Sequence, residues 1–486
     1  MPDLTITDRI KKLFTGKSMR SLALKGGFWL GMGSGLEYGL RFLRNIILVR
    51  LLAPESFGLM AIILAVNGAL GAFTFVGINE AVIQSPDGGE ETYLNAAWWL
   101  SLVRSAGLFF IALIFVPALT SFYSVASYSL MFKVSFLSIL FNGAMSARAY
   151  IAQKKMDFKK WMIVSNGGAA IGILTAIGLT FWLHSVWALV IGYVAEAAGR
   201  CLLSFIICPY LPRMHFKKEH TKALWKYASG MFGLPVLYFF FKEADVFVIG
   251  KLLPKKELGL YSMAMRLAQM PILIVSTIIN PILMPMFSTK QADRPWVNRT
   301  LIKSTRPILL AGSPIVCFFA LYGKDLLTVV YGPQYATVAI PFAILLAATL
   351  FRTAATPISN VYFAIGKPQL QRFFLIIRAA LMIVIIYPAV RFFGLTGAAC
   401  AGLFSMLAGY FFQVLRMQDL GYLDLRRYGA IFLYAIAIST IVFIVWSAAG
   451  RLSLQPFHNM FLGFMWCMAA YVFLGLITFK LYRKAV

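Results

Sequence analysis

Long apolar segments follow one another along nearly the whole chain. A helix that crosses a bilayer needs about 20 mostly apolar residues, and the sequence holds about fourteen such segments, the first opening near residue 22 and the last near residue 459. With 60% hydrophobic residues and a mean hydropathy of +0.78, the chain is more apolar than a soluble protein of 486 residues. The connections are too short for a folded soluble domain, so we predict an all-α integral membrane protein.

Two stretches of sequence return later in the chain with the same internal spacing. The pattern of Arg50–Leu52 and Phe57–Leu59 recurs as Lys251–Leu253 and Leu258–Leu260. Parallel repeats in a membrane protein build two halves around a central cavity, and rocking of the halves gives alternating access. We therefore favour transport as the function. The predicted parts are a basic N-terminus at 1–21, pseudo-symmetric six-helix bundles at 22–212 and 213–422, and two additional helices at 423–486.

Lysine and arginine concentrate in the connections on one side of the predicted spans. Because cytoplasmic loops carry this excess, we predict a multi-pass protein with both termini in the cytoplasm. The formal net charge of +27 is explained mostly by these loops, which face anionic lipid headgroups. We therefore expect membrane lipids as partners and no nucleic acid.

Catalytic and metal-binding motifs are missing from the sequence. The five cysteines fall inside predicted spans without disulfide or zinc spacing, and the four histidines form no nucleophile or metal motif. A membrane glycosyltransferase or polymerase would need catalytic acids on a sizeable outer loop, and the predicted outer loops are short. We expect no enzyme activity, no metal and no cofactor.

Charged residues inside the predicted spans carry the most informative chemistry, and basic ones outnumber acidic ones. Each ionised group at the bilayer centre costs about 2.5 to 3.5 kcal/mol on insertion, so these groups should face a wet cavity or each other. Those nearest mid-depth or somewhat off centre are Glu37, Arg41, Arg44, Arg104, Lys133, Glu196, Arg200, Lys242, Glu243, Asp245, Arg266, Arg352 and Arg378.

Glu37, Arg41 and Arg44 are three and four residues apart, so they share one face of the first predicted span. One interpretation is a cavity wall that holds an anionic group, and the other is a Glu37–Arg41 pair that only locks helices together. We favour the first, because the sequence places no second acid near Arg44 on this stripe. Glu196 and Arg200, four apart in the sixth span, are better explained as a pair that neutralises itself.

Arg352 is the corresponding candidate in the second half of the chain. Thr356 and Asn360 follow it at helical spacing in the tenth predicted span, and no carboxylate lies near it in the sequence. This pattern favours ligand binding over a purely structural role.

Three charged residues of the seventh predicted span, Lys242, Glu243 and Asp245, lie within four positions of one another and cannot all face one side. A carboxylate that reaches the cavity could bind a proton or Na⁺ and couple transport to an ion gradient. A pair with Lys242 explains the same pattern equally well.

The chain also resembles a known family. The residues that carry the resemblance are Arg41–Asn45, Arg50–Gly58 and Ala81–Gln84. They are similar to the opening of the polysaccharide-transporter family, the Wzx-type oligosaccharide flippases of the multidrug/oligosaccharidyl-lipid/polysaccharide exporter superfamily. The likeness continues through the second repeat and so covers nearly the whole chain.

The resemblance implies two six-helix bundles followed by two extra helices. It also implies that the protein flips undecaprenyl-pyrophosphate-linked oligosaccharide repeat units across the bacterial inner membrane for exopolysaccharide, capsule or O-antigen synthesis, with other polysaccharide assembly proteins as partners. A cationic interior suits this substrate, because arginine meets a pyrophosphate with paired hydrogen bonds. Arg44 aligns with a first-helix arginine that is also seen in the related lipid II flippases.

Two alternatives use the same fold. A lipid II flippase would share the arginines, whereas a multidrug cation antiporter would want an acidic cavity and is disfavoured by the excess of basic residues. No family ion-coupling site is matched, so the coupling ion stays open between a proton and Na⁺. The predicted substrate-binding residues are Arg41, Arg44, Arg104, Lys242, Arg266, Arg352 and Asn360. The ion-coupling candidates are Glu37, Glu196, Glu243 and Asp245.

Overall fold

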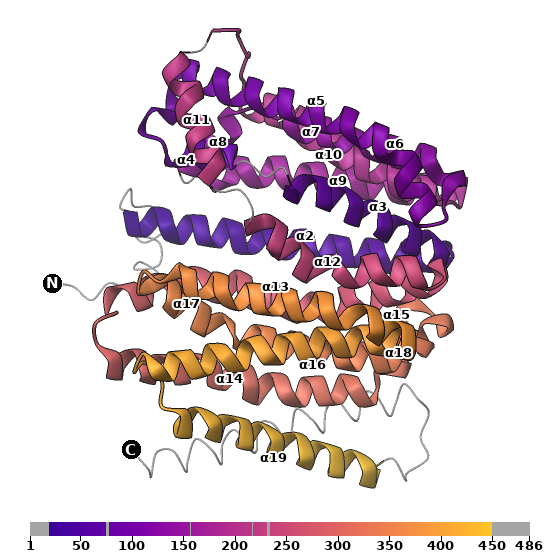
Figure 1. Ribbon diagram of the computed structural model, residues 1–486, viewed down its shortest axis with the longest axis vertical. Helices are drawn as coiled ribbons and strands as arrows, with labels where there is room; N and C mark the ends of the chain where they lie inside the picture. The colour runs from indigo at the N-terminus through magenta and orange to yellow at the C-terminus, as the bar shows by residue number, and fades with distance from the viewer. Residues whose placement is uncertain (1–18, 74–76, 156, 216, 231–233, 450–486) are drawn as a thin grey trace, which may run out of the picture. The chain divides into compact units, whose positions relative to one another are not determined.

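The computed structural model describes residues 19–73, 77–155, 157–215, 217–230 and 234–449, and it consists almost entirely of α-helices (Figure 1). No strand occurs among these described residues. A helix satisfies its own backbone N–H and C=O groups, which a bilayer interior requires because it offers no water as a partner. The all-α prediction is confirmed for the described part of the chain.

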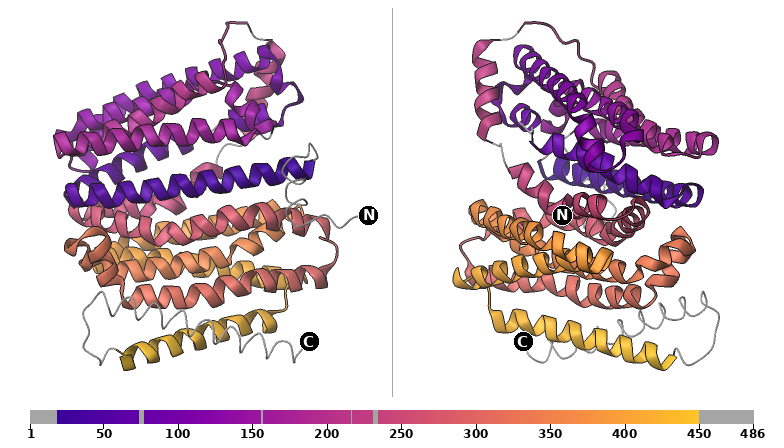
Figure 2. Two further views of the ribbon diagram at one scale, coloured as in Figure 1. Left: turned by 180° about the vertical axis from the view of Figure 1, so that it is seen from behind. Right: turned by 45° about the vertical axis from the view of Figure 1, so that its right-hand side comes forward.

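Contacts between residues divide the chain into two compact units, residues 1–239 and 240–486. In the first unit α9 packs along α10, and α2 lies against α9. Two further views show α2, coloured indigo, as one long helix (Figure 2). The helices are α2 (Met19–Leu51), α3 (Pro54–Phe73), α4 (Ile78–Gln84), α5 (Glu91–Phe122), α6 (Ser129–Ser135), α7 (Leu137–Gly143), α8 (Arg148–Lys154), α9 (Phe158–Leu183), α10 (Val186–Ile207) and α11 (Lys218–Gly230).

In the second unit α16 packs against α13, α14 and α18, and α14 also packs against α19. Buried apolar side chains of α13, α14, α16, α17, α18 and α19 form one continuous core. The helices are α12 (Leu234–Leu252), whose first residues precede the division, α13 (Lys255–Thr289), α14 (Arg294–Leu321), α15 (Gly323–Tyr331), α16 (Ala339–Ala354), α17 (Thr356–Ala364), α18 (Pro368–Asp419) and α19 (Leu425–Ala449).

The 52-residue helix α18 is in fact two limbs, 368–393 and 395–419, joined at Gly394. Gly394 has φ 56° and ψ −137°, which is not a helical conformation and which residues with a Cβ rarely adopt. The limbs lie side by side, because Ser405 of the second contacts Met382 of the first at 4.0 Å between Oγ and Sδ. In the order of the chain, the two limbs of α18 come directly after the short helix α17, just as the α9–α10 pair comes directly after the short helix α8.

Seven helical segments of the described residues are long and apolar enough to cross a membrane, or eight if the bent segment from Ala126 to Lys154 counts as one span. Pro368–Asp419 alone covers the two predicted spans that open near 371 and 395. The span predicted near 459 and most of the N-terminal segment 1–21 lie outside the described residues. The chain is a multi-pass membrane protein, while the count of about fourteen and the two six-helix bundles stay predictions.

The repeated sequence pattern falls at equivalent structural positions. Leu51 ends α2 and Pro54 begins α3, and in the second copy Leu252 ends α12 and Lys255 begins α13 after Pro254. In both copies a short break therefore separates two helices at the repeated leucines. The domain boundary expected at 212/213 stays a prediction.

Candidate functional site

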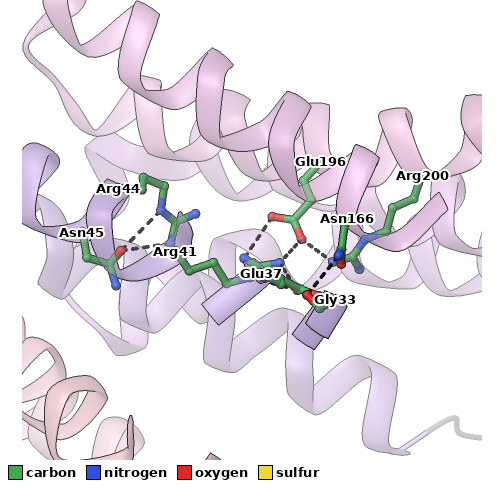
Figure 3. A network of polar contacts seen from close by, with 8 residues as sticks. All are labelled: Gly33, Glu37, Arg41, Arg44, Asn45, Asn166, Glu196 and Arg200. Atoms are coloured by element: carbon green, nitrogen blue, oxygen red, sulfur yellow. Dashed lines mark hydrogen bonds and ion pairs between the residues drawn. The ribbon is translucent and has the colours of Figure 1, made fainter. Parts of the chain in front are cut away.

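The stripe of charge on α2 meets α10 through a network of polar contacts (Figure 3). We call this network the ionic cluster; its members are Glu37, Arg41, Arg44, Asn45, Asn166, Glu196 and Arg200. It joins three helices of the first unit, because Asn166 lies on α9 and donates from Nδ2 to the Gly33 carbonyl of α2 at 3.0 Å. The cluster thus brings together residues that are more than 150 positions apart in the sequence.

Arg41 lies between two carboxylates. Its Nη1 and Nη2 donate to the two oxygens of Glu196 at 3.2 and 2.5 Å, and its Nε donates to Glu37 Oε1 at 3.0 Å. The contact with Glu196 is the forked, bidentate arrangement that gives an arginine–carboxylate pair both strength and orientation. The Glu37–Arg41 pair, which was the less favoured interpretation of the spacing, is present, and the second, stronger contact comes from α10.

Glu196 is itself shared between two arginines. Its Oε1 accepts from Arg41 and also from Arg200, one turn further along α10, so the predicted Glu196–Arg200 pair is present as well (Figure 3). Arg44 donates from Nε and Nη2 to Asn45 Oδ1 at 3.3 and 3.0 Å and interacts electrostatically with Glu196. The cluster therefore contains three guanidinium groups and two carboxylates.

Small residues on α9 and α10 bring the cluster together. A Cβ added to Gly172 would lie 2.7 Å from the Gly192 carbonyl oxygen, and one added to Gly192 would lie 2.9 Å from the Gly172 carbonyl oxygen. Gly199 on the next turns of α10 faces Ile171 at a similarly short 2.9 Å. Such close approach requires small side chains in membrane helices, and it places the backbone of Glu196 directly against α9.

Exposure differs within the cluster in a way that bears on its chemistry. The side chains of Arg41 and Arg200 are 26% and 29% exposed, whereas the Glu196 side chain between them is only 10% exposed. An incoming group would therefore reach the guanidinium groups more readily than the carboxylate. With an excess of one positive charge among the five ionised members, the cluster is suited to an anion.

Arg104, the remaining predicted binding residue of the first unit, lies on α5. It interacts electrostatically with Tyr150 of α8, and α5 packs against α7 and α11. Its role in binding stays a prediction.

The charged residues of α12 separate into a pair and a single carboxylate. Lys242 Nζ lies 3.3 Å from Glu243 Oε1 at the partly exposed side of the helix. Asp245 is 5% exposed, and its oxygens accept from the Tyr261 hydroxyl at 3.1 Å and from the Val246 backbone N–H at 2.9 Å. The three residues thus lie on different sides of α12, which agrees with their spacing in the sequence. Their roles in binding or ion coupling are untested.

Arg352 and Asn360, expected in one span, lie on two successive helices. α16 ends at Ala354 and α17 begins at Thr356, with Pro357 in its first turn. Helical contacts nevertheless continue across the junction, because Thr356 Oγ1 donates to the Arg352 carbonyl at 3.4 Å. Within α17, Asn360 Nδ2 donates to the Thr356 carbonyl at 3.0 Å. Arg266 is exposed on α13 and interacts electrostatically with Tyr331.

A second buried arginine, which we did not select as a binding residue, lies between the limbs of α18. Arg378 is 7% exposed, and its Nη2 donates to Gln413 Oε1 at 2.7 Å, while Gln413 Nε2 donates to Gln371 Oε1 at 2.8 Å. Its side chain packs over Gly409. We call Arg378, Gln413 and Gln371 the amide cluster. The sequence signal that could have found it is a glutamine in an otherwise apolar helix.

Groups of three or more His, Cys, Asp or Glu side chains placed for a metal ion do not occur within the described ranges. Neither cluster therefore supplies a carboxylate set of the kind that a hard cation prefers.

A family model described as "Polysaccharide biosynthesis protein" matches residues 47–340. Among curated proteins, the chain is 25% identical to the succinoglycan biosynthesis transport protein ExoT of Rhizobium meliloti (strain 1021) over 63% of this chain and 62% of that protein. It is 20% identical to the lipopolysaccharide biosynthesis protein WzxC of Escherichia coli (strain K12) over 81% of this chain and 78% of that protein.

Solved structures share the fold at lower identity. The lipid II flippase MurJ in an inward closed conformation matches with a TM-score of 0.78 and 12% identity, over 93% of this chain and 98% of that chain. An inward-facing multidrug resistance transporter of the MATE family in the MOP superfamily matches with a TM-score of 0.59 and 15% identity, over 85% and 98%. The expected transporter fold is confirmed.

Proposed function

Because the chain belongs to the polysaccharide biosynthesis protein family, we propose that it flips a lipid-linked, anionic saccharide precursor across the bacterial inner membrane. The substrate we propose is an undecaprenyl-pyrophosphate-linked oligosaccharide repeat unit, moved from the cytoplasmic to the periplasmic leaflet for exopolysaccharide, capsule or O-antigen synthesis. The names of ExoT and WzxC support this class of pathway, although the match spans less than two thirds of ExoT.

The observation that carries the proposal is the ionic cluster. Three arginines gather on facing helices around two carboxylates, and Arg41 and Arg200 are more exposed than the Glu196 between them. A pyrophosphate offers several oxygens in the geometry that a guanidinium fork binds, and Arg is better suited to this than Lys. Arg41 and Arg44 are the proposed contacts in the first unit. The additional contacts we propose are Arg104, Lys242, Arg266, Arg352 and Asn360.

The proposed cycle is alternating access. Rocking of two repeat-related halves would expose the bound pyrophosphate first to the cytoplasmic and then to the periplasmic leaflet, while the lipid tail stays in the bilayer. The repeated sequence pattern and the likeness to the MurJ fold support this cycle. Both termini are proposed to be cytoplasmic, and other polysaccharide assembly proteins are proposed partners.

Coupling to a proton or Na⁺ gradient would require a carboxylate that changes its state during the cycle. The candidates remain Glu37, Glu196, Glu243 and Asp245. Asp245 is the most isolated of them, since its described contacts are a phenol and a backbone N–H.

A lipid II flippase is the second candidate function, and the MurJ-like fold favours it. Lipid II also carries a pyrophosphate between a polyprenyl chain and sugars, so the ionic cluster would serve both substrates. A multidrug cation antiporter fits less well, because a cluster with more arginines than carboxylates repels a cationic drug.

Deletion of the gene in its own bacterium tests the proposal directly. We expect lipid-linked repeat units to accumulate on the cytoplasmic face and surface polysaccharide to be lost, and restoration of both by the wild-type gene. Normal polysaccharide with arrested cell-wall synthesis would instead assign lipid II as the substrate. Normal polysaccharide with altered sensitivity to cationic drugs would contradict both flippase functions.

Complementation of that strain with Arg44→Glu tests the cluster. We expect no flipping at normal protein levels, because a carboxylate at this position repels the pyrophosphate. Arg50→Glu, an exposed position further along α2, is the matched control and should retain most transport. Full transport by the Arg44 variant would remove Arg44 from the proposed site.

A further inference from the structure

The carboxylate of Glu196 occupies the place on Arg41 that a phosphate would need. It takes both Nη1 and Nη2 of the guanidinium with its two oxygens, at 3.2 and 2.5 Å. A phosphate group binds arginine with the same two-oxygen geometry. Glu196 and a substrate phosphate therefore cannot hold this edge of Arg41 at the same time.

Glu37 contacts Arg41 in a different way. Its single oxygen Oε1 lies 3.0 Å from both Nε and Nη2, and it sits one turn away on the same helix. Loss of that contact would leave the Nη1–Nη2 edge of Arg41 still covered by Glu196. Of the two carboxylates, Glu196 is the one that spans this edge.

Arg200 remains an ion-pair partner for the Glu196 carboxylate when that carboxylate leaves Arg41. It already donates from Nη2 to Glu196 Oε1, the same oxygen that Arg41 Nη2 contacts. A buried carboxylate that lost its only cation would be strongly destabilised, and Arg200 removes most of that penalty. Release of Arg41 is therefore an exchange of partners and not the exposure of a lone buried charge.

The other ionisable groups near Glu196 do not remove this competition. Arg44 on α2 acts on it electrostatically, and Tyr193 on α10 carries a phenol near both Glu196 and Arg200. α9 contributes glycine positions against the Glu196 backbone and the neutral amide of Asn166 to the cluster. Arg41 and Arg200 remain its direct ion-pair partners.

We propose that Glu196 is an internal substitute for the substrate phosphate: it occupies Arg41 when the site is empty and passes to Arg200 when a diphosphate binds. This inference rests on the proposed function and assigns how the same site is regulated. Competition from Glu196 makes the affinity for the substrate weaker than the arginines alone would give. A transporter needs such a limit, because a diphosphate that binds too tightly is not released on the other side.

The test is a binding measurement on the purified full-length protein in lipid nanodiscs. The probe is a diphosphate substituted at both ends, with a short prenyl chain and one sugar, because a terminal phosphate would titrate near pH 6. We expect Glu196→Gln to bind this probe about tenfold more tightly than wild type, since loss of one charged contact of this kind changes affinity by about that factor. Glu37→Gln, which removes the other carboxylate from Arg41, should change affinity by less than about threefold.

Arg200 variants separate this exchange from simple charge removal. Arg200→Gln should weaken binding, because Glu196 then has no partner but Arg41. The double variant Glu196→Gln, Arg200→Gln should bind as tightly as Glu196→Gln alone. If Arg200 instead binds the phosphate itself, the double variant will be weaker than the single one, and the exchange is wrong.

Equal or weaker binding by Glu196→Gln than by wild type would overturn the inference while leaving the proposed function intact. If the Gln variant is not recovered as folded protein, Glu196→Asp keeps the charge but withdraws it by one methylene, and it should bind more tightly than wild type. Unchanged affinity in the Asp variant would also count against the exchange. Absence of probe binding by wild type and every variant would contradict the proposed function of the cluster, and this inference with it.

Discussion

The α9–α10 pair follows α8 as the two limbs of α18 follow α17, but the two pairs hold an arginine in opposite ways. Arg200 of α10, together with Arg41 of α2, meets charged Glu196, whereas buried Arg378 meets the neutral amide of Gln413. Within the described residues, the Arg378 guanidinium makes this one hydrogen bond, and its buried Nε has no partner.

The difference separates an exchangeable site from a fixed one. In the ionic cluster one carboxylate is shared by two arginines, so partners can change without leaving a charge alone. In the amide cluster, Arg378 depends on Gln413 among the described residues. Loss of this partner therefore leaves the buried guanidinium without a hydrogen-bond acceptor there. The first arrangement suits binding, and the second suits a permanent join between two helices.

Gln413→Leu should have the largest effect, because it removes the one hydrogen-bond acceptor that buried Arg378 has among the described residues. We expect a loss of about 3 kcal/mol in stability, as for other broken buried charge contacts. Thermal unfolding of the detergent-solubilised protein, followed by tryptophan fluorescence, measures this loss. Arg378→Met in the same chain should recover most of it, and failure of the double variant to do so would mean that Gln413 acts through something other than Arg378.

Gly394→Ala should break the join between the limbs of α18. The conformation at Gly394 is open to glycine but strained for any residue with a Cβ, so we expect a loss of about 2 kcal/mol. Gly402→Ala, in the same helix with open space around its Cα, is the matched control and should be neutral or slightly stabilising. The first pair is joined differently: His184 caps α9 at φ 43°, ψ 37°, which a non-glycine residue can adopt. Equal unfolding temperatures for the two glycine variants would argue against a strained join.

Gly172→Ala should separate α9 from α10 by a few tenths of an ångström or more. Its Cβ would come 2.7 Å from the Gly192 carbonyl oxygen, and overpacking of this kind costs about 1 to 2 kcal/mol. Gly178→Ala, two turns along α9 with nothing within 4 Å of its Cβ, should be harmless. We further expect the Gly172 variant to lose transport, because the shift displaces Glu196. Normal transport at reduced stability would show that the cluster tolerates a looser pair.

Gln413→Glu should have the smallest effect and tests the comparison most closely, because it gives Arg378 the carboxylate that Arg200 already has. The new ion pair gains charge but must be desolvated, so we expect a change in stability of less than about 1 kcal/mol. Gln371 can turn its amide to donate to the new carboxylate. A loss as large as that of Gln413→Leu would show that the donated hydrogen bond from Gln413 to Gln371 matters more than the charge on Arg378.

Much of the fold could be predicted from the sequence, because long apolar segments in a bilayer have few alternatives to helices. The repeated leucines located two equivalent breaks between helices, and helical spacing predicted the Glu196–Arg200 pair and offered the Glu37–Arg41 pair as the less favoured alternative. Spacing could not find the contact between Arg41 and Glu196, since it depends on how α2 packs against the α9–α10 pair. The break at Ala355 between α16 and α17 is marked in the sequence by Pro357, because proline interrupts the helical hydrogen bonds.

The Arg378 site was missed for a related reason. Arg378 was kept among the charges inside the predicted spans but was not selected as a binding residue, and its partner Gln413 carries no charge to attract notice. Neutral amides bind buried charge as hydrogen-bond acceptors, and only the packing of the two limbs shows which amide does so. The assignment of substrate-binding and ion-coupling roles remains a prediction, because geometry gives contacts and not occupancy.

The hydrogen bond from Asn166 to the Gly33 carbonyl joins α2 to α9 at one point, and α9 packs closely against α10. Arg41 lies eight residues beyond this point, roughly 12 Å along the helix axis. A swing of α2 by only about 10° about Gly33 therefore moves Arg41 by roughly 2 Å, which is enough to break its hydrogen bonds to Glu196. A small tilt of α2 is thus sufficient to open or close the arginine fork.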